Sequence, residues 1–158
     1  MRLTAVTHID GDVFSTEREV VGHGVNIRGV MGAGIAVSVK RFFPDVFDPY
    51  RQACFTGDLV PGKTLMVECT DARNPNNSKW IANMASQDNP GPHARLEWFR
   101  SSLESTMKFA QSKGFSGIAI PHIGAGIGGL DLTDVFEVID EVAKAFPSVD
   151  VDVYNFVR

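Results

Sequence analysis

Two clusters of glycine are the part of this chain whose residue types and spacing most clearly indicate chemistry. Residues 29–34 read GVMGAG and lead into a helical pattern, whereas residues 124–129 read GAGIGG and follow the apolar run 118–120. Glycine lacks a Cβ atom, so it adopts left-handed backbone conformations and lets another group approach closely. A strand end, a glycine loop and a helix start together present unpaired backbone N–H groups, which bind anions. The two loops therefore predict two walls around one ligand that carries phosphates.

The absence of positive charge from both loops narrows the kind of phosphate ligand. Neither residues 29–39 nor residues 114–143 contain Lys or Arg. Backbone N–H groups and helix N-termini would therefore hold the phosphates, which suits a diphosphate diester. A phosphoryl-transfer site normally uses Lys, Arg and Mg²⁺ to neutralise developing charge. We accordingly expect no metal and no resident cofactor.

Two other interpretations of the glycine clusters remain open. The spacing of Gly124, Gly126 and Gly129 matches the dinucleotide fingerprint of Rossmann enzymes. That fingerprint normally follows the first strand of its fold, whereas here one helix and one strand remain after it. The clusters could also be purely structural, as tight turns that let helices pack closely on a sheet.

The length and composition indicate one globular domain, residues 1–158, large enough to bury a core. The formal net charge of −4 argues against general nucleic-acid binding, which requires a basic face. Cys54 and Cys69 lack the spacing of a disulfide framework, so we expect reduced thiols. No apolar run reaches the roughly 18 residues of a membrane span, and the N-terminus lacks a signal-peptide core. We therefore expect a cytoplasmic protein that does not bind membranes.

Short apolar strands alternate with amphipathic helices along the chain. The periodicity predicts strands over residues 3–9, 19–26, 65–70, 80–85, 117–121 and 149–157. It predicts helices over residues 33–43, 45–55 and 93–112, and a last helix that Thr133 caps and Pro147 ends. The polar segment 71–79 and the segment 87–92 are predicted to be loops. This alternation predicts a three-layer α/β/α sandwich, and the first two strands, with no helix between them, favour a mixed central sheet.

Three sequence motifs together resemble those of the macro domain, the ADP-ribose-binding family. They are GDVF at residues 11–14, HGVN at 23–26 leading to GAGIA at 32–36, and IPHIGAG at 120–126. The resemblance covers nearly the whole chain. It is strongest to the branch that contains the terminal ADP-ribose-protein glycohydrolase, the DarG-type antitoxins and the fungal ADP-ribose-1″-phosphate phosphatase. It implies a macro domain fold and, as partner, ADP-ribose or an ADP-ribosylated macromolecule.

The resemblance also implies a role for individual residues. Asp12 would accept a hydrogen bond from the adenine amino group, because a carboxylate is purely an acceptor, and Val13 would add a backbone contact. Asn26 would face the distal ribose, and either Tyr154 or Phe156 would flank the adenine. Two sets of residues would line the diphosphate and the distal ribose: Gly32, Ala33, Gly34 and Ile35 on one side, and Gly124, Gly126, Ile127 and Gly128 on the other.

The chain differs from the glycohydrolase of this branch at the two residues that carry catalysis in that enzyme. There, a Lys after the central strand and an Asp in the second glycine loop carry catalysis. A gapless alignment from the long helix places Gln87 and Gly128 at these positions. Glutamine forms no lysyl adduct and glycine has no side chain, so the Lys–Asp mechanism does not fit this sequence.

Three other residues are candidates for catalysis. His23 is either a general acid or base, which suits the pKa of imidazole, or a buried hydrogen-bonded residue beside the pocket. Asp131 either replaces the missing Asp or begins a helix, where acidic residues are favoured. Asn26 would hold a water against a ligand phosphate, in substrate-assisted chemistry.

Two functions from different classes follow from these residues. The first is hydrolysis of an ADP-ribosyl ester or glycoside on a macromolecule, or of ADP-ribose-1″-phosphate. The alternative is a non-catalytic reader of ADP-ribose or of ADP-ribosylated partners, which the missing Lys–Asp pair favours.

Overall fold

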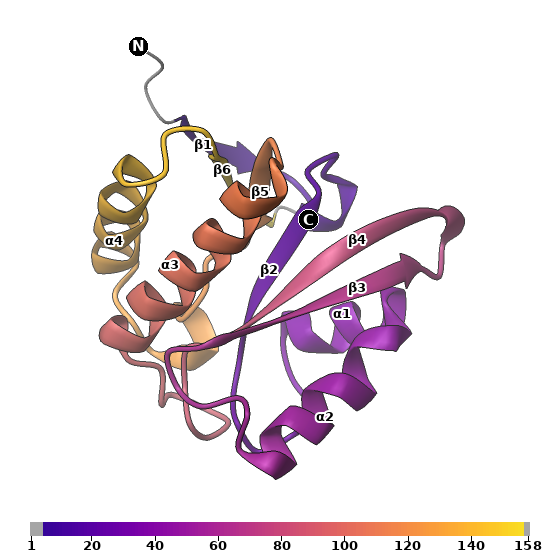
Figure 1. Cartoon of the computed structure of the whole chain (residues 1–158). Coiled ribbons are helices and arrows are strands. Elements are labelled where there is room, and N and C mark those ends of the chain that lie inside the picture. The colour runs from indigo at the N-terminus through magenta and orange to yellow at the C-terminus, as the bar shows by residue number, and fades with distance from the viewer. Residues whose placement is uncertain (1–4, 157–158) are drawn as a thin grey trace.

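The computed structural model describes residues 5–156 as a six-stranded sheet with helices on both faces (Figure 1). The strands are β1 (Val6–Asp10), β2 (Val20–Val25), β3 (Thr64–Asp71), β4 (Asn74–Ala85), β5 (Gly117–Ile120) and β6 (Asp150–Asn155). The α-helices are α1 (Ile35–Phe42), α2 (Phe47–Thr56), α3 (Leu96–Lys113) and α4 (Leu132–Lys144). Short 3₁₀ helices are η1 (Val13–Ser15), η2 (Pro44–Val46) and η3 (Gly126–Gly128). None of the helices within residues 5–156 is both long and apolar enough to cross a membrane.

The sheet is mixed, as the sequence predicts, but its antiparallel strand is β3 and not one of the first two strands, from which the mixed sheet was predicted. Its strand order is β1-β6-β5-β2-β4-β3, in which the first five strands are parallel and β3 runs antiparallel to β4 at the edge. Val20 of β2 pairs with Ile118 of β5 on one side and with Trp80 of β4 on the other. The carboxyl ends of β2 and β5 therefore meet at one edge of the sheet, and they bring the two glycine loops together there.

The core lies in two layers, one on each face of the sheet. Alternate residues of the strands enter opposite layers, as period-two geometry requires: Val20 and Met84 pack under α3 and α4, whereas Val21 and Ala85 pack under α1 and α2. Figure 1 shows the two helix pairs on opposite sides of the sheet. The α/β/α sandwich is thus confirmed.

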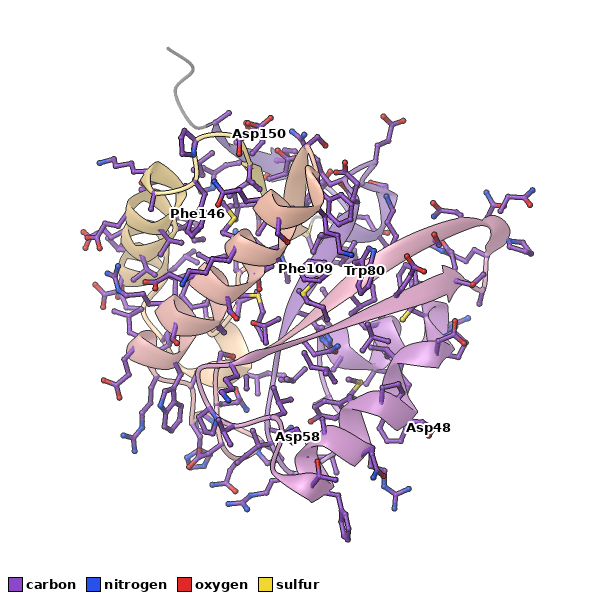
Figure 2. The ribbon with its side chains drawn as sticks, in the orientation of Figure 1. Asp48, Asp58, Trp80, Phe109, Phe146 and Asp150 are labelled. Atoms are coloured by element: carbon purple, nitrogen blue, oxygen red, sulfur yellow. The ribbon has the colours of Figure 1, made fainter. Side chains whose placement is uncertain are left out.

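Aromatic contacts fix the long helix α3 on the sheet. The rings of Trp80 on β4 and Phe109 on α3 lie with their centroids 4.9 Å apart (Figure 2). Phe99, Leu103 and Met107, spaced four residues apart on α3, are completely buried against the same face. The apolar residues whose spacing predicts this helix are therefore the residues that it buries against the sheet.

The predicted loop at residues 71–79 is wrong. β3 continues to Asp71 and β4 begins at Asn74, so these residues form the end of a hairpin with a tight turn. Most side chains of residues 72–78 are exposed and polar, and the turn is fixed to α1, because the Ala72 N–H donates to the Phe42 carbonyl at 2.8 Å. Arg73 clamps the turn, because its backbone N–H and its guanidinium both donate to Asp71.

Several predicted boundaries also shift. α3 begins at Leu96 rather than at residue 93, because Arg95 keeps an extended conformation and Ala94 forms an isolated bridge with Gln87. α1 begins at Ile35, after Gly34. The cap of α4 is Asp131 rather than Thr133. Parts of the first and last predicted strands, residues 3–4 and 157, lie outside the described residues.

Candidate functional site

A cleft of about 1170 Å³ lies at the carboxyl edge of the sheet, where the loops after β2 and β5 face each other. The residues predicted to bind a ligand come from four separate segments, and the structure brings all of them into its lining. These residues are Asp12, Val13, Asn26, Gly32, Ala33, Gly34, Ile35, Gly124, Gly126, Ile127, Gly128 and Phe156. The volume is that of a site for a large organic ligand, because pockets for drug-sized molecules range from about 300 to 1,000 Å³.

Asn26 organises the first glycine loop. Its Oδ1 accepts a hydrogen bond from the Arg28 backbone N–H at 2.9 Å, and its Nδ2 donates to the Val30 carbonyl at 3.0 Å. The buried hydroxyl of Tyr50, on α2, donates to the Asn26 carbonyl at 2.8 Å. Burial raises the pKa of Tyr50, so this donor keeps its proton. The loop is therefore held in one shape before any ligand arrives.

The second glycine loop needs two of its glycines for different reasons. Gly124 has φ of +79°, and a Cβ there would lie 2.6 Å from Cδ1 of Leu130. Its carbonyl accepts from the Leu130 N–H at 2.8 Å, which closes the turn. Gly126 has φ of +68°, but a Cβ there would meet no heavy atom within 4 Å. Gly124 thus shapes the loop, whereas Gly126 keeps the cleft open.

The two loops approach each other across the cleft. A Cβ on Gly34 would lie 3.3 Å from Cδ1 of Ile127, whose side chain is largely exposed. Gly34 has φ of 61° and ψ of −147°, a conformation that favours glycine, and α1 begins at the next residue. The N-terminus of α1 therefore opens onto the cleft where the two loops approach each other.

The carboxylate of Asp12 and the ring of Phe156 lie at the other end of the cleft, after β1 and β6. Oδ1 of Asp12 accepts from the Phe14 N–H at 2.9 Å and so caps η1. This bond orients an exposed carboxylate toward the lining. Phe156 is also exposed, while Tyr154 is half-buried beside Gly11.

The structure places His23 outside the lining of the cleft. The imidazole is completely buried in β2, and its Nε2 lies 2.8 Å from Oδ1 of Asn83 on β4. Burial lowers the pKa of His23 to about 4, so the ring is neutral near pH 7. Since Nδ2 of Asn83 donates to the Leu65 carbonyl, its Oδ1 accepts from His23. Of the two interpretations of His23, the structure therefore favours a buried, hydrogen-bonded residue beside the cleft over a general acid or base.

Asp131 also lies outside the cleft lining. Its Oδ1 accepts from the backbone N–H groups of Thr133 at 2.9 Å and Asp134 at 3.3 Å, and so caps α4. Of the three candidates for catalysis, Asn26 alone contributes to the cleft.

Gln87 and Gly128, which the sequence resemblance aligns with the catalytic Lys and Asp of the glycohydrolase, are neighbours in space. Oε1 of Gln87 lies 3.4 Å from the point that a Cβ on Gly128 would occupy. Nε2 of Gln87 donates to the carbonyls of Asn89 and Gly91, at 2.6 and 3.3 Å. The amide therefore folds the 87–92 loop over this end of the cleft.

Ser86 is a cleft residue that sequence reasoning missed. It follows β4 directly, its exposed fraction is 1%, and it lines the cleft beside Gly24 and Ile123. Among residues 5–156, its Oγ is one of two buried side-chain polar atoms that lack a hydrogen-bond partner. The sequence could have indicated Ser86 by its position immediately before Gln87, at the end of a strand that was predicted to be buried.

Together, the sandwich and the cleft between two glycine loops define the class of protein as an α/β/α domain with a ligand-sized cleft at the carboxyl edge of its sheet. The sequence model of the family described as Macro domain matches residues 23–139, so the chain belongs to the macro domain family.

Two of the similar proteins are bacterial enzymes of the same name. The chain is 30% identical over 149 residues to the DNA ADP-ribosyl glycohydrolase of Mycobacterium tuberculosis, covering 94% of this chain and 42% of that protein. It is 30% identical over 147 residues to the enzyme of the same name from Thermus aquaticus, covering 93% and 40%. The chain thus spans less than half the length of these relatives. The solved macrodomain of Mycobacterium tuberculosis DarG superposes with a TM-score of 0.84 at 29% identity, covering 96% of this chain and 97% of that one.

Proposed function

We propose that the cleft binds ADP-ribose and that the chain hydrolyses ADP-ribosyl derivatives. The observation that carries this proposal is the pair of glycine loops that close on each other at Gly34 and Ile127 without a basic side chain in either. The names of the 30% identical relatives support hydrolysis of an ADP-ribosyl group from DNA as the first reaction to test. An ADP-ribosyl group on protein and ADP-ribose-1″-phosphate are the other substrates.

We infer the orientation of the ligand in the cleft from the order of the strands. Asp12 follows β1 and Phe156 follows β6, so the adenine lies over this edge of the sheet. The loops after β5 and β2 come next and take the diphosphate. The terminal ribose then extends over the ends of β2 and β4, near Asn26 and Gln87. Neighbouring strands lie about 4.8 Å apart, so the span from β6 to β4 is about 14 Å, which suits an extended ADP-ribose.

Backbone groups hold the diphosphate in this arrangement. The N-terminus of α1, immediately after Gly34, supplies N–H groups and the positive end of a helix dipole. The open side of Gly126 lets the opposite loop approach the same phosphates. At the adenine end, the free oxygen of Asp12 accepts from the exocyclic amino group, and Phe156 covers the ring.

Asn26 is the residue that we assign to the reacting end. An amide nitrogen carries two N–H groups, and Asn26 uses one on the Val30 carbonyl. The other binds the terminal ribose or a water held against a ligand phosphate. That water attacks the anomeric carbon and its proton passes to the phosphate. The bond from the anomeric carbon to the leaving group breaks, and the leaving group departs with the electron pair and takes up the proton from the phosphate or from solvent. We assign no step to His23 or Asp131, because neither lines the cleft.

The hydrolase proposal is tested with three substrates: an ADP-ribosylated oligonucleotide, a peptide carrying glutamate-linked ADP-ribose, and ADP-ribose-1″-phosphate. We expect release of ADP-ribose from at least one of them. The release should disappear in Gly32→Leu, whose side chain would project into the cleft from a position with no neighbour within 4 Å.

A non-catalytic reader is the second candidate function. The replacement of the Lys–Asp pair by Gln87 and Gly128 favours it, since neither residue supplies a nucleophile or a charged base. Tight binding of ADP-ribose with no turnover of any of the three substrates would establish the reader and contradict the hydrolase.

A further inference from the structure

The turn between β3 and β4 is fixed by an arginine that also reaches a distant part of the chain. Asp71, the last residue of β3, is buried, and its two carboxylate oxygens accept from Nε and Nη2 of Arg73 at 3.0 and 2.9 Å. Nδ2 of Asn77 donates to the same carboxylate at 3.2 Å. These bonds, that of Arg73 first, lower the pKa of Asp71, so a charged carboxylate holds the guanidinium in one orientation.

The guanidinium held in this way contacts the segment that follows β1. Its Nη2 also donates to the carbonyl of Phe14 at 3.0 Å. Its Cζ lies 4.4 Å from the ring centroid of Phe42, at the end of α1, and the rings of Phe42 and Phe14 meet edge to face with centroids 5.1 Å apart. Both rings line the cleft, whereas Arg73 does not. Any effect of Arg73 on a ligand therefore passes through these two residues.

A single residue, Phe14, joins Arg73 to Asp12. The N–H of Phe14 donates to Oδ1 of Asp12 at 2.9 Å, and the carbonyl of Phe14 is the group that Arg73 binds. The two preceding carbonyls, those of residues 12 and 13, accept hydrogen bonds within the same turn. The pKa of Arg73 is raised, chiefly by the hydrogen bond to Asp71 and also by the charge of Asp12. The turn that presents Asp12 is thus held from within by its own backbone and from outside by Arg73.

The position of the Asp12 carboxylate bears on which base the cleft accepts. In the proposed function, the free oxygen of this carboxylate accepts from the amino group of adenine. Hypoxanthine carries a carbonyl oxygen in place of that amino group, and a carboxylate, which is purely an acceptor, gains no hydrogen bond from it. Hydrogen bonds weaken steeply when their geometry is lost, so a displaced Asp12 would distinguish the two bases less well.

We propose that Arg73 is a positioning residue of the cleft: by bridging Asp71 and the Phe14 carbonyl, it holds the turn of Asp12 in place and thereby sets a preference for adenine over hypoxanthine. The inference rests on the proposed binding of ADP-ribose. It assigns Arg73 no contact with the ligand and no part in breaking a bond.

The test compares calorimetric titrations of ADP-ribose and of its hypoxanthine analogue, inosine diphosphate ribose. For Arg73→Ala we expect the affinity for ADP-ribose to fall about 3–10-fold, as for one weakened hydrogen bond. The affinity for the analogue should stay within about twofold of the wild-type value, because the analogue lacks the amino group that Asp12 accepts from.

Arg100→Ala is the matched control. The side chain of Arg100 is 40% exposed, against 38% for Arg73, and its guanidinium also pairs with a carboxylate, that of Glu141. That pair joins α3 to α4, on the face of the sheet opposite to Phe42, and neither residue lines the cleft. Arg100→Ala should change neither affinity.

A second measurement separates positioning from a merely structural role. Asp12→Asn removes the charge and the second oxygen on which the proposed preference depends. If Arg73 acts through Asp12, adding Arg73→Ala to Asp12→Asn should lower the affinity for ADP-ribose by less than about twofold. A structural role would give the same loss in both backgrounds.

Arg73→Lys separates the bridge from the charge. A lysine ammonium lacks the planar fork that binds Asp71 and the Phe14 carbonyl together, so the preference for adenine should fall as it does in Arg73→Ala. The same variant carries the comparison if Arg73→Ala fails to fold.

Several results would overturn the inference. Equal losses for the two ligands, or unchanged affinities, would exclude Arg73 from base preference, and a full preference in Arg73→Lys would assign the effect to charge alone. If the wild type bound both ligands equally, the inference would fail while the proposed binding of ADP-ribose stood. If the wild type bound neither ligand, the proposed function itself would fail.

Discussion

The side-chain oxygen of Gln87 lies 3.4 Å from the point where a Cβ on Gly128 would stand. These residues come from different loops, after β4 and after β5, and the Ala94 N–H donates to the Gly128 carbonyl at 3.2 Å to tie the loops together. The sequence resemblance aligns them with the catalytic Lys and Asp of the glycohydrolase, a correspondence that stays a prediction. A Lys and an Asp at positions 87 and 128 would therefore lie within reach of each other.

The double substitution Gln87→Lys with Gly128→Asp should accelerate release of ADP-ribose from an ADP-ribosylated oligonucleotide. The change places an amine and a carboxylate within reach of each other at the reacting end of the cleft. A Cβ at 128 comes within 3.0 Å of Cβ of Ala94, so we expect a stability cost of about 1–3 kcal/mol. Single-turnover rates of the double and of both single variants measure the effect. If the double variant were no faster than either single variant, placing a Lys and an Asp at these two positions would not be sufficient for catalysis.

Asp131 should act through the start of α4 and not through the reaction. Asn is as good a cap as Asp, so Asp131→Asn should leave both stability and ADP-ribose release nearly unchanged. Asp131→Ala removes the acceptor for the Thr133 and Asp134 N–H groups and should cost about 1 kcal/mol of unfolding free energy. Urea unfolding and the release assay report the two effects. Loss of activity in Asp131→Asn, with stability intact, would reverse this assignment.

His23 should make the protein less stable in acid. Burial holds its folded-state pKa near 4, below the ordinary 6.5, so the unfolded chain binds the proton first as the pH falls. The unfolding free energy should therefore decrease between pH 6.5 and 4, by up to about 1.4 kcal/mol per unit and about 3 kcal/mol in total. Unfolding of the wild type and His23→Gln at several pH values isolates this effect in their difference. A difference that does not change with pH would mean that His23 titrates normally.

Two glycines of the cleft should respond to substitution in opposite ways. Gly32 has space for a side chain and no left-handed backbone, so Gly32→Leu should block ADP-ribose while the melting temperature stays nearly constant. In Gly124→Ala, the new Cβ would lie 2.6 Å from Cδ1 of Leu130, and the backbone there is left-handed. This substitution should therefore lower the free energy of unfolding by about 1–3 kcal/mol. Thermal melts with and without ligand distinguish the two. Unfolding of Gly32→Leu would instead make the first loop a structural turn.

The parts of the site that the sequence could predict are those encoded by neighbouring residues. The glycine loops and Asp12 each belong to a short motif, so their convergence on one ligand could be predicted from the two loops and from the family resemblance. The hairpin end at residues 71–79 was missed because its strands are held by pairing with each other and not by an apolar pattern. Strand propensity alone gives no signal for such polar edges.

The remaining errors concern burial, which depends on distant parts of the chain. His23 lies in a central strand covered on both faces, and the motif HGVN contains nothing that separates a buried ring from one in the cleft. Ser86 is buried because β4 lies beside β2, where its hydroxyl packs against Gly24. Neither relationship can be seen without the register of the sheet.

Calorimetric titration with ADP-ribose of the wild type and of Asp12→Asn tests the central claim most directly. Asn keeps an oxygen that caps the Phe14 N–H, but it loses the negative charge and the second carboxylate oxygen that would accept from adenine. We predict a one-site isotherm for the wild type and a loss of about 1.5–3 kcal/mol in Asp12→Asn, as for a hydrogen bond to a charged group. A wild-type protein that gives neither heat nor a thermal shift with ADP-ribose would contradict the account, even though the chain has the macro domain fold.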